Sequence, residues 1–154
     1  MIHRFEHHAM ATPWVVSIAG GNADTAAWAA QEAFGLVDRL EEDLSRFKPI
    51  SYVCQLGRLK AGESLHVSAE VFECLQLGKA VWEATSGAFD MTVRRDSQQG
   101  WHSQMQHLVL CEGMVVQVTE DKVAIDLGGI GKGFAVDEIT GLFLEHEITN
   151  ALVD

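Results

Sequence analysis

The residues with the clearest potential for chemistry lie in one glycine-rich stretch from Asp126 to Phe134, which reads DLGGIGKGF. Glycine takes positive φ readily, and it lets a ligand approach the main chain without meeting a Cβ atom. Such a turn can aim backbone amides at an anion beside the N-terminus of a following helix, where the helix dipole also favours negative charge. Lys132 would add a cation, so phosphate is the natural ligand for this stretch.

The spacing alone does not select phosphate. The stretch is neither G-x-G-x-x-G nor the phosphate loop that ends in G-K-[ST], because Gly133 and Phe134 follow Lys132. A tight connection from strand to helix uses glycine for the same reasons, and that interpretation stays open. Asp90 and Thr92, two apart on an extended segment, share a face and could offer oxygen ligands, against the alternative of an aspartate that only caps a turn.

Histidine and cysteine do not form a metal site or a disulfide framework in this sequence. His7 and His8 are adjacent, so they point to opposite faces of a strand. Cys54, Cys74 and Cys111 are odd in number and lack C-x-x-C spacing. We therefore expect buried, reduced thiols.

Hydrophobic periodicity predicts the elements that position these residues. Helices are predicted from about Asn22 or Asp24 to Leu44, from the N-cap Ser68 to about Ala84, and from the glycine turn to about Glu145. Strands are predicted over 2–8, 14–19, 65–67, 107–111, 114–118, 123–125 and 150–153. Loops are predicted over 45–53 and 94–106, with Trp101 tucked into the protein.

Composition bounds the class of protein. The chain has 154 residues with 47% hydrophobic content, which suits a single domain over 1–154. The 11 Lys and Arg against 22 Asp and Glu give a net charge of −11, which argues against a nucleic-acid or anionic-membrane surface. There is no apolar run of about 18 residues and no signal-peptide core, so no transmembrane segment is expected. As written the chain is predicted to be cytoplasmic, and it would be periplasmic if an export segment had been removed.

Four segments, in this order, resemble the ApbE family of FAD:protein FMN transferases. They are AMAT at 9–12, LEEDLSRFKPIS at 40–51, SGAFDMTV at 86–93, and IDLGGIGKGFAVD at 125–137 with NALVD at 150–154. The resemblance implies an α+β fold, related to the T-fold, with a mixed or antiparallel sheet and flanking helices. It also implies Mg²⁺-dependent transfer of FMN from FAD to a threonine hydroxyl of an acceptor protein.

The resemblance further implies roles for single residues. Met10 would lie near the flavin, and Phe47 would stack on the isoalloxazine ring where relatives commonly have tyrosine. Lining of the adenosine and flavin site is implied for Ala88, Phe89 and Asp90. Contacts at the glycine turn are implied for Gly128, Lys132 and Phe134, with Lys132 near phosphate, and Gly131 would offer a backbone carbonyl to the metal. No catalytic residue is assigned.

The family pattern continues beyond NALVD into a Gly-Gly-Asp turn and a part that carries a catalytic histidine and the remaining metal ligands. We therefore expect this chain to be the N-terminal part of the family fold, apparently truncated and weak or inactive alone. A non-catalytic flavin-binding or regulatory domain derived from the family is an alternative. A structural module whose glycine turn only joins strand to helix is another. The interrupted final strand favours pairing with a second copy, as in a homo-oligomer, or with a partner.

Overall fold

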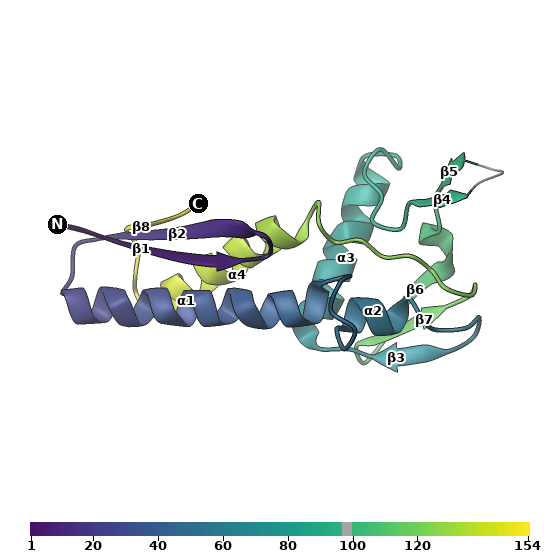
Figure 1. Cartoon of the computed structure of the whole chain (residues 1–154), viewed down its shortest axis with the longest axis horizontal. Coiled ribbons are helices and arrows are strands. Elements are labelled where there is room, and N and C mark those ends of the chain that lie inside the picture. Colours follow the sequence, from purple (N-terminus) through teal and green to yellow (C-terminus); the bar gives the residue numbers. More distant parts are fainter. Residues whose placement is uncertain (97–99) are drawn as a thin grey trace. The chain divides into compact units, whose positions relative to one another are not determined.

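The computed structural model describes residues 1–96 and 100–154, and its contacts divide the chain into two compact units (Figure 1). Unit 1 comprises Met1–Glu41 and Lys132–Asp154, and unit 2 comprises Glu42–Gly131. Both combine helices with antiparallel strands, so the predicted α+β class is confirmed. That residues 1–154 act as one domain stays a prediction.

Unit 1 is built on a three-stranded antiparallel sheet in the order β1-β2-β8. Strands β1 (Ile2–Ala9) and β2 (Thr12–Ala19) form a hairpin whose register runs from Ile2 opposite Ala19 to Ala9 opposite Thr12. Met10 and Ala11 both have positive φ, as a two-residue hairpin turn requires. On its other edge β2 pairs with the short strand β8 (Ala151–Val153).

Two helices accompany this sheet. Helix α1 (Ala23–Leu44) starts where the Asn22 side chain accepts the Thr25 amide at 2.7 Å, and the β1-β2 hairpin lies along it in Figure 1. Its small residues Ala26, Ala30 and Ala33 are buried on one stripe, which is the spacing that predicted this helix. Helix α4 (Gly131–Glu145) follows the glycine turn and buries Ile139 and Phe143 on its own stripe.

Unit 2 contains a second antiparallel sheet, in the order β3-β7-β6. Strands β6 (Leu108–Cys111) and β7 (Val115–Val118) form the predicted hairpin, and β3 (Ser64–His66) pairs with the other edge of β7. Helix α3 (Ala69–Ala84) begins as predicted at Ser68, whose hydroxyl accepts the Val71 amide. Shorter elements complete the unit: α2 (Tyr52–Leu56), β4 (Arg94–Asp96), β5 (Gly100–His102) and the 3-10 turn Met105–His107.

The segment 123–125 is not a strand, which corrects the sequence prediction. Val123 and Ile125 are buried as their apolar character indicates. The amides of this segment do not follow a strand ladder, because the Ala124 amide donates to the Gln104 side chain and the Asp126 amide donates to the Met91 carbonyl. The short apolar run therefore predicted the burial of Val123 and Ile125 correctly and the strand pairing wrongly.

Two loop predictions also differ from the structure. Helix α2 lies partly in the predicted loop over 45–53, because the Ser51 hydroxyl accepts the Cys54 amide at 3.0 Å and so caps a short helix. The predicted loop over 94–106 contains β4 and β5, and its residues 97–99 lie outside the described residues. Trp101 is 71% exposed rather than tucked in, because it lies on a short strand whose pairing among the described residues is a two-stranded sheet with β4.

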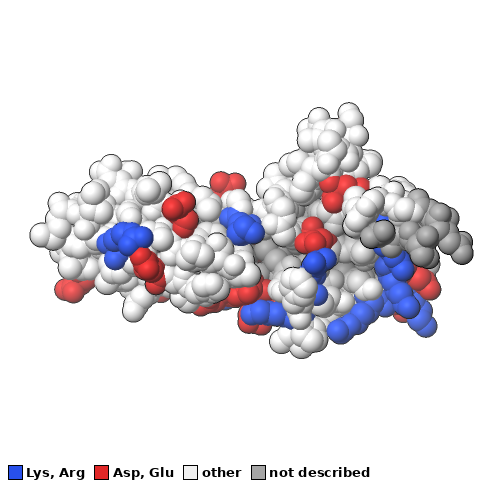
Figure 2. Space-filling model, turned by 45° about the horizontal axis from the view of Figure 1, so that its top comes forward, with Lys and Arg blue, Asp and Glu red and all other residues white. Residues whose placement is uncertain are grey.

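The face drawn in Figure 2 carries both acidic and basic side chains. Within the described ranges, none of the helices combines the length and apolar character that a membrane crossing needs.

Candidate functional site

A cavity of about 440 Å³ in unit 2 contains three of the predicted site residues, namely Phe89, Asp90 and Gly128. Four separate stretches of the chain form its walls. The lining residues are Arg46, Phe89, Asp90, Met91, Val93, Trp101, Ala124, Ile125, Asp126, Gly128 and Gly129. The fold thus brings the Ala-Phe-Asp segment to the glycine turn, as the sequence-based assignment of both to one site requires.

Asp90 is held in place by the residue two positions further on. Its Oδ1 atom accepts hydrogen bonds from both the amide and the hydroxyl of Thr92, each at 2.7 Å. Thr92 is fully buried, whereas Asp90 lies at the cavity wall. The aspartate therefore caps a turn, which was the plainer of the two interpretations, and it also faces the cavity.

Gln104 joins two walls of the cavity, and sequence reasoning missed it. Gln104 is 1% exposed, and its backbone N–H group donates to the Thr92 hydroxyl at 3.2 Å. The Gln104 Oε1 atom accepts the Ala124 amide at 2.9 Å, and Nε2 donates to Glu120 at 3.2 Å. A glutamine in a polar stretch carries no sequence signal of this role, because only the fold shows that it is buried.

The glycine turn is only partly open to a ligand. The Gly128 amide donates to the Asp126 carboxylate at 2.9 Å, and the amides of Ile130 and Gly131 both donate to the Leu127 carbonyl. Gly129 lines the cavity, and a Cβ atom there would lie 3.2 Å from the Phe89 ring. The close approach of Phe89 is a physical reason for glycine at position 129, and it applies whether or not the turn binds an anion.

An ion pair lies at the cavity wall beside this turn. Arg46 Nη1 is 3.0 Å from Asp126 Oδ2, and both side chains are about half exposed, at 51% and 50%. The Arg46 guanidinium carbon also lies 4.7 Å from the centroid of the Phe47 ring. Sequence reasoning singled out neither Arg46 nor the charge of Asp126, although the Ser-Arg-Phe segment carried part of the family resemblance.

Two predicted residues of unit 2 lie beside the cavity wall rather than in it. Phe47 is 79% exposed and follows Arg46 directly. Ala88 is exposed at the end of a turn after α3, in which Thr85 accepts the Ala88 amide through its carbonyl and the Phe89 amide through its hydroxyl. This turn orients Phe89 toward the glycine turn.

The other predicted contacts belong to unit 1. Met10 occupies the tip of the β1-β2 hairpin with φ of 49°. Lys132 is exposed in the first turn of α4, and Phe134, two residues further along the same helix, is 6% exposed. Their roles toward a flavin nucleotide stay predictions.

The described residues do not fit a complete metal site. They hold no group of three His, Cys, Asp or Glu side chains placed to bind a metal ion. Gly131, the predicted metal ligand, is buried at the first position of α4, where a carbonyl accepts the amide four residues on. A single backbone carbonyl does not hold Mg²⁺, which takes oxygen ligands in octahedral geometry.

Buried thiols give no nucleophile to this site. Burial raises the pKa of the Cys74 thiol to about 12, so the group stays protonated and unreactive at neutral pH. All three cysteines are free thiols, but the prediction that they are buried holds for Cys74 alone, because Cys54 and Cys111 are half-buried.

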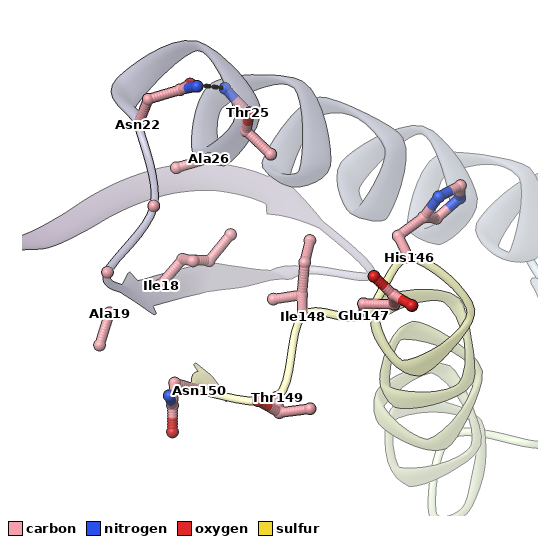
Figure 3. Close-up of a pocket in the computed structure, with 12 residues that line it drawn as sticks. Ile18, Ala19, Asn22, Thr25, Ala26, His146, Glu147, Ile148, Thr149 and Asn150 are labelled. Atoms are coloured by element: carbon pink, nitrogen blue, oxygen red, sulfur yellow. Dashed lines mark hydrogen bonds between the residues drawn. The ribbon is translucent and has the colours of Figure 1, made fainter.

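A second cavity, of about 310 Å³, lies in unit 1 between the end of β2, the start of α1 and the segment that leads to β8 (Figure 3). It contains none of the predicted site residues. Two of its polar groups, the Asn22 side chain and the Thr25 amide, are bonded to each other as the N-cap of α1. The cavity of unit 2 is therefore the candidate functional site.

Comparison with known proteins points to one family. The model of the ApbE family matches residues 10–154. None of the curated proteins compared with the chain matches it.

Several solved structures share the fold, and each covers 100% of this chain. A mutant of the flavin transferase ApbE from Vibrio cholerae aligns with a TM-score of 0.86 at 18% identity. The ApbE protein from Thermotoga maritima aligns at 0.84 and 22%, and the apo flavinyl transferase ApbE from Pseudomonas stutzeri at 0.85 and 20%. This chain covers 60%, 56% and 55% of those chains, respectively. The likeness confirms the predicted fold over the part that is shared.

Proposed function

The chain belongs to the ApbE family, and on that premise we propose that unit 2 binds FAD in its cavity as part of a flavin transferase. One observation carries the proposal. Phe89 and Asp90 on one segment and Gly128 on another, assigned to a flavin nucleotide by resemblance alone, line the same cavity.

The chemistry of the walls suits a flavin nucleotide. Phe89, Val93 and Trp101 offer apolar and aromatic surface to a planar ring. One oxygen of Asp90 is occupied by Thr92, and the second is free to accept from a hydroxyl or amino group of the nucleotide. The volume of about 440 Å³ lies in the lower part of the usual range for ligand pockets, which suits one portion of a dinucleotide.

The remaining family-implied contacts form part of this proposal. We place Phe47 and Met10 next to the isoalloxazine, Ala88 next to the nucleotide, and Lys132 with Phe134 at the phosphate end. Lys132 and Phe134 lie in the first turn of the helix that follows the glycine turn, where the N-terminal end of a helix dipole favours an anion. Gly131 would offer its carbonyl to a metal ion.

The proposed reaction moves FMN from FAD to a threonine of an acceptor protein. The threonine oxygen forms a bond to the FMN phosphorus, the bond from that phosphorus to the AMP oxygen breaks, and AMP leaves with the electron pair while a base takes the hydroxyl proton. Enzymes catalyse such transfers chiefly by positioning and by stabilising charge. Unit 2 contributes binding and orientation, and no described residue is assigned as the base.

Magnesium, when bound, would neutralise charge on the diphosphate. Because the described residues do not fit a complete site, no step of this account passes through the ion. A flavin-binding domain without transferase activity, derived from the same family, is the second candidate function.

Titration of the full chain with FAD tests the proposal. We expect binding by the unchanged protein and at least tenfold weaker binding by Asp90→Ala, because the substitution removes both a wall group and the cap of the turn. Glu112→Ala is the matched control, since it removes the same charge from the exposed turn between β6 and β7. An absence of FAD binding at millimolar concentration would refute the proposal.

Incubation with FAD, Mg²⁺ and an acceptor peptide that contains threonine separates the two candidate functions. Covalently bound flavin on the peptide indicates a transferase. FAD binding without any transfer indicates the binding domain.

A further inference from the structure

Arg46 lies between the start of the glycine turn and the Phe47 ring, which are the places proposed for the diphosphate and the flavin ring. Its guanidinium contacts Asp126 at the start of the glycine turn on one side and the ring of Phe47 on the other. Among the described residues that line the cavity, it is the one cationic side chain. The proposed flavin ring and the proposed diphosphate therefore share this residue as a neighbour.

The charges of the described cavity lining make Arg46 the group there that can attract an anion. Asp90 and Asp126 both line the cavity and both repel a diphosphate. Arg46 is neutralised by Asp126 in the structure, so its charge serves a ligand only if it leaves that partner. A half-exposed ion pair contributes little free energy, whereas paired hydrogen bonds from a guanidinium to phosphate oxygens are strong. Exchange of the carboxylate for a diphosphate is thus favourable.

The two partners differ in their freedom to move. Asp126 is fixed by the turn, since its other oxygen accepts the Gly128 amide at 2.9 Å. Arg46 is a long, half-exposed side chain. Arg46 is therefore the member of the pair that changes position.

The contact with Phe47 gives this movement a second consequence. The guanidinium lies over one face of the Phe47 ring, which is otherwise exposed. A flavin that stacks on this face has to displace Arg46, and a diphosphate that draws Arg46 away uncovers the face.

We propose that Arg46 binds the diphosphate of the flavin nucleotide and that, by leaving Asp126 and Phe47 together, it couples diphosphate binding to stacking of the flavin ring. The inference rests on the proposed function, because it assumes that the ligand of this cavity is a flavin dinucleotide.

The test uses the full chain, the variant Arg46→Gln and two ligands that divide FAD. Lumiflavin carries the ring without phosphate, and ADP carries the diphosphate without the ring. Arg46→Gln should weaken FAD binding by about tenfold, equal to 1.4 kcal/mol, and should leave lumiflavin binding unchanged or stronger. ADP should strengthen lumiflavin binding to the unchanged protein and not to the variant.

Arg58→Gln is the matched control. Arg58 is an exposed arginine of the same unit that donates to the Pro49 carbonyl and does not line the cavity. Circular dichroism checks that both variants fold. Arg46→Lys, which keeps the charge and loses the paired geometry, should fall between the unchanged protein and Arg46→Gln in FAD affinity.

Three results would overturn the inference. The first is FAD binding by Arg46→Gln that equals that of the unchanged protein. The second is an equal loss of FAD and lumiflavin binding in the variant, which would make Arg46 a contact to the ring. The third is an absence of any effect of ADP on lumiflavin. If the unchanged protein binds no FAD, the proposed function itself fails. A loss of FAD binding that is confined to the Arg46→Gln variant leaves the proposed function intact.

Discussion

Replacement of Gln104 by methionine should open the wall of the cavity while it keeps the volume of the side chain. Methionine is nearly isosteric with glutamine, so the substitution removes hydrogen bonds without leaving a large void. The Ala124 amide would lose its 2.9 Å bond to Oε1, and Glu120 would lose the amide donor at 3.2 Å. Because the side chain of Gln104 is 1% exposed, water reaches this place poorly.

The expected loss of folding stability follows from the lost bond between the Ala124 amide and the Gln104 Oε1 atom. A buried amide without a partner costs about 1–3 kcal/mol. The bond to Glu120 adds little, since that carboxylate is about half exposed and regains water. We expect unfolding in urea to show a loss of about 1–3 kcal/mol. The Ala124 amide should exchange with solvent at least tenfold faster, as a loss of 1.4 kcal/mol implies when exchange occurs through opening of this bond.

Gln76→Met is the control for this experiment, because Gln76 is an exposed glutamine on helix α3 of the same unit. A surface substitution of this kind changes stability by less than about 0.5 kcal/mol. Gln104→Met should also weaken FAD binding, since the segments of Thr92 and Ala124 would no longer be tied. Stability and Ala124 exchange equal to those of the control would refute this role of Gln104.

Three further predictions test neighbouring parts of unit 2. Gly78→Ala should destabilise the protein by about 1–3 kcal/mol in urea unfolding, because the new Cβ atom would overlap the Met91 sulfur; an unchanged midpoint would contradict this packing. Gly129→Ala should weaken FAD binding in a titration, since its Cβ atom would lie 3.2 Å from the Phe89 ring, and unchanged affinity would show that this approach does not shape the cavity. Partial burial, with the nearby Glu70 carboxylate, raises the pKa of Asp43, so this group stabilises the fold below its unfolded pKa and loses that contribution as the pH rises through its folded value. Asp43→Asn should therefore stabilise the protein at pH 7 relative to the unchanged chain and lose this advantage near pH 3, as thermal melts at both pH values would show.

Most elements could be predicted because their sequence periods report burial directly. The alanine stripe of α1, the N-cap Ser68 and the hairpin around Glu112-Gly113 are local features, and the structure contains each of them. The segment 123–125 could not be predicted in the same way. A short apolar run reports that it is buried, and only tertiary contacts decide whether its amides meet a strand or a side chain such as Gln104.

Motif resemblance predicted three residues that line the candidate site, and it did not predict the residues that act through distant neighbours. Phe89, Asp90 and Gly128 came from motif resemblance, and they line one cavity. Arg46 and Gln104 meet their partners across 80 and 20 residues, and no local pattern encodes those pairings. The division into two units likewise depends on the folded contacts.

A crystal structure of the full chain with bound FAD tests the central claim most directly. Our account predicts nucleotide density in the unit 2 cavity, against Phe89, Asp90 and Gly129, with Arg46 turned away from Asp126 toward the phosphates. Density in the unit 1 cavity beside Asn22 and His146, with the cavity of unit 2 empty, would contradict it.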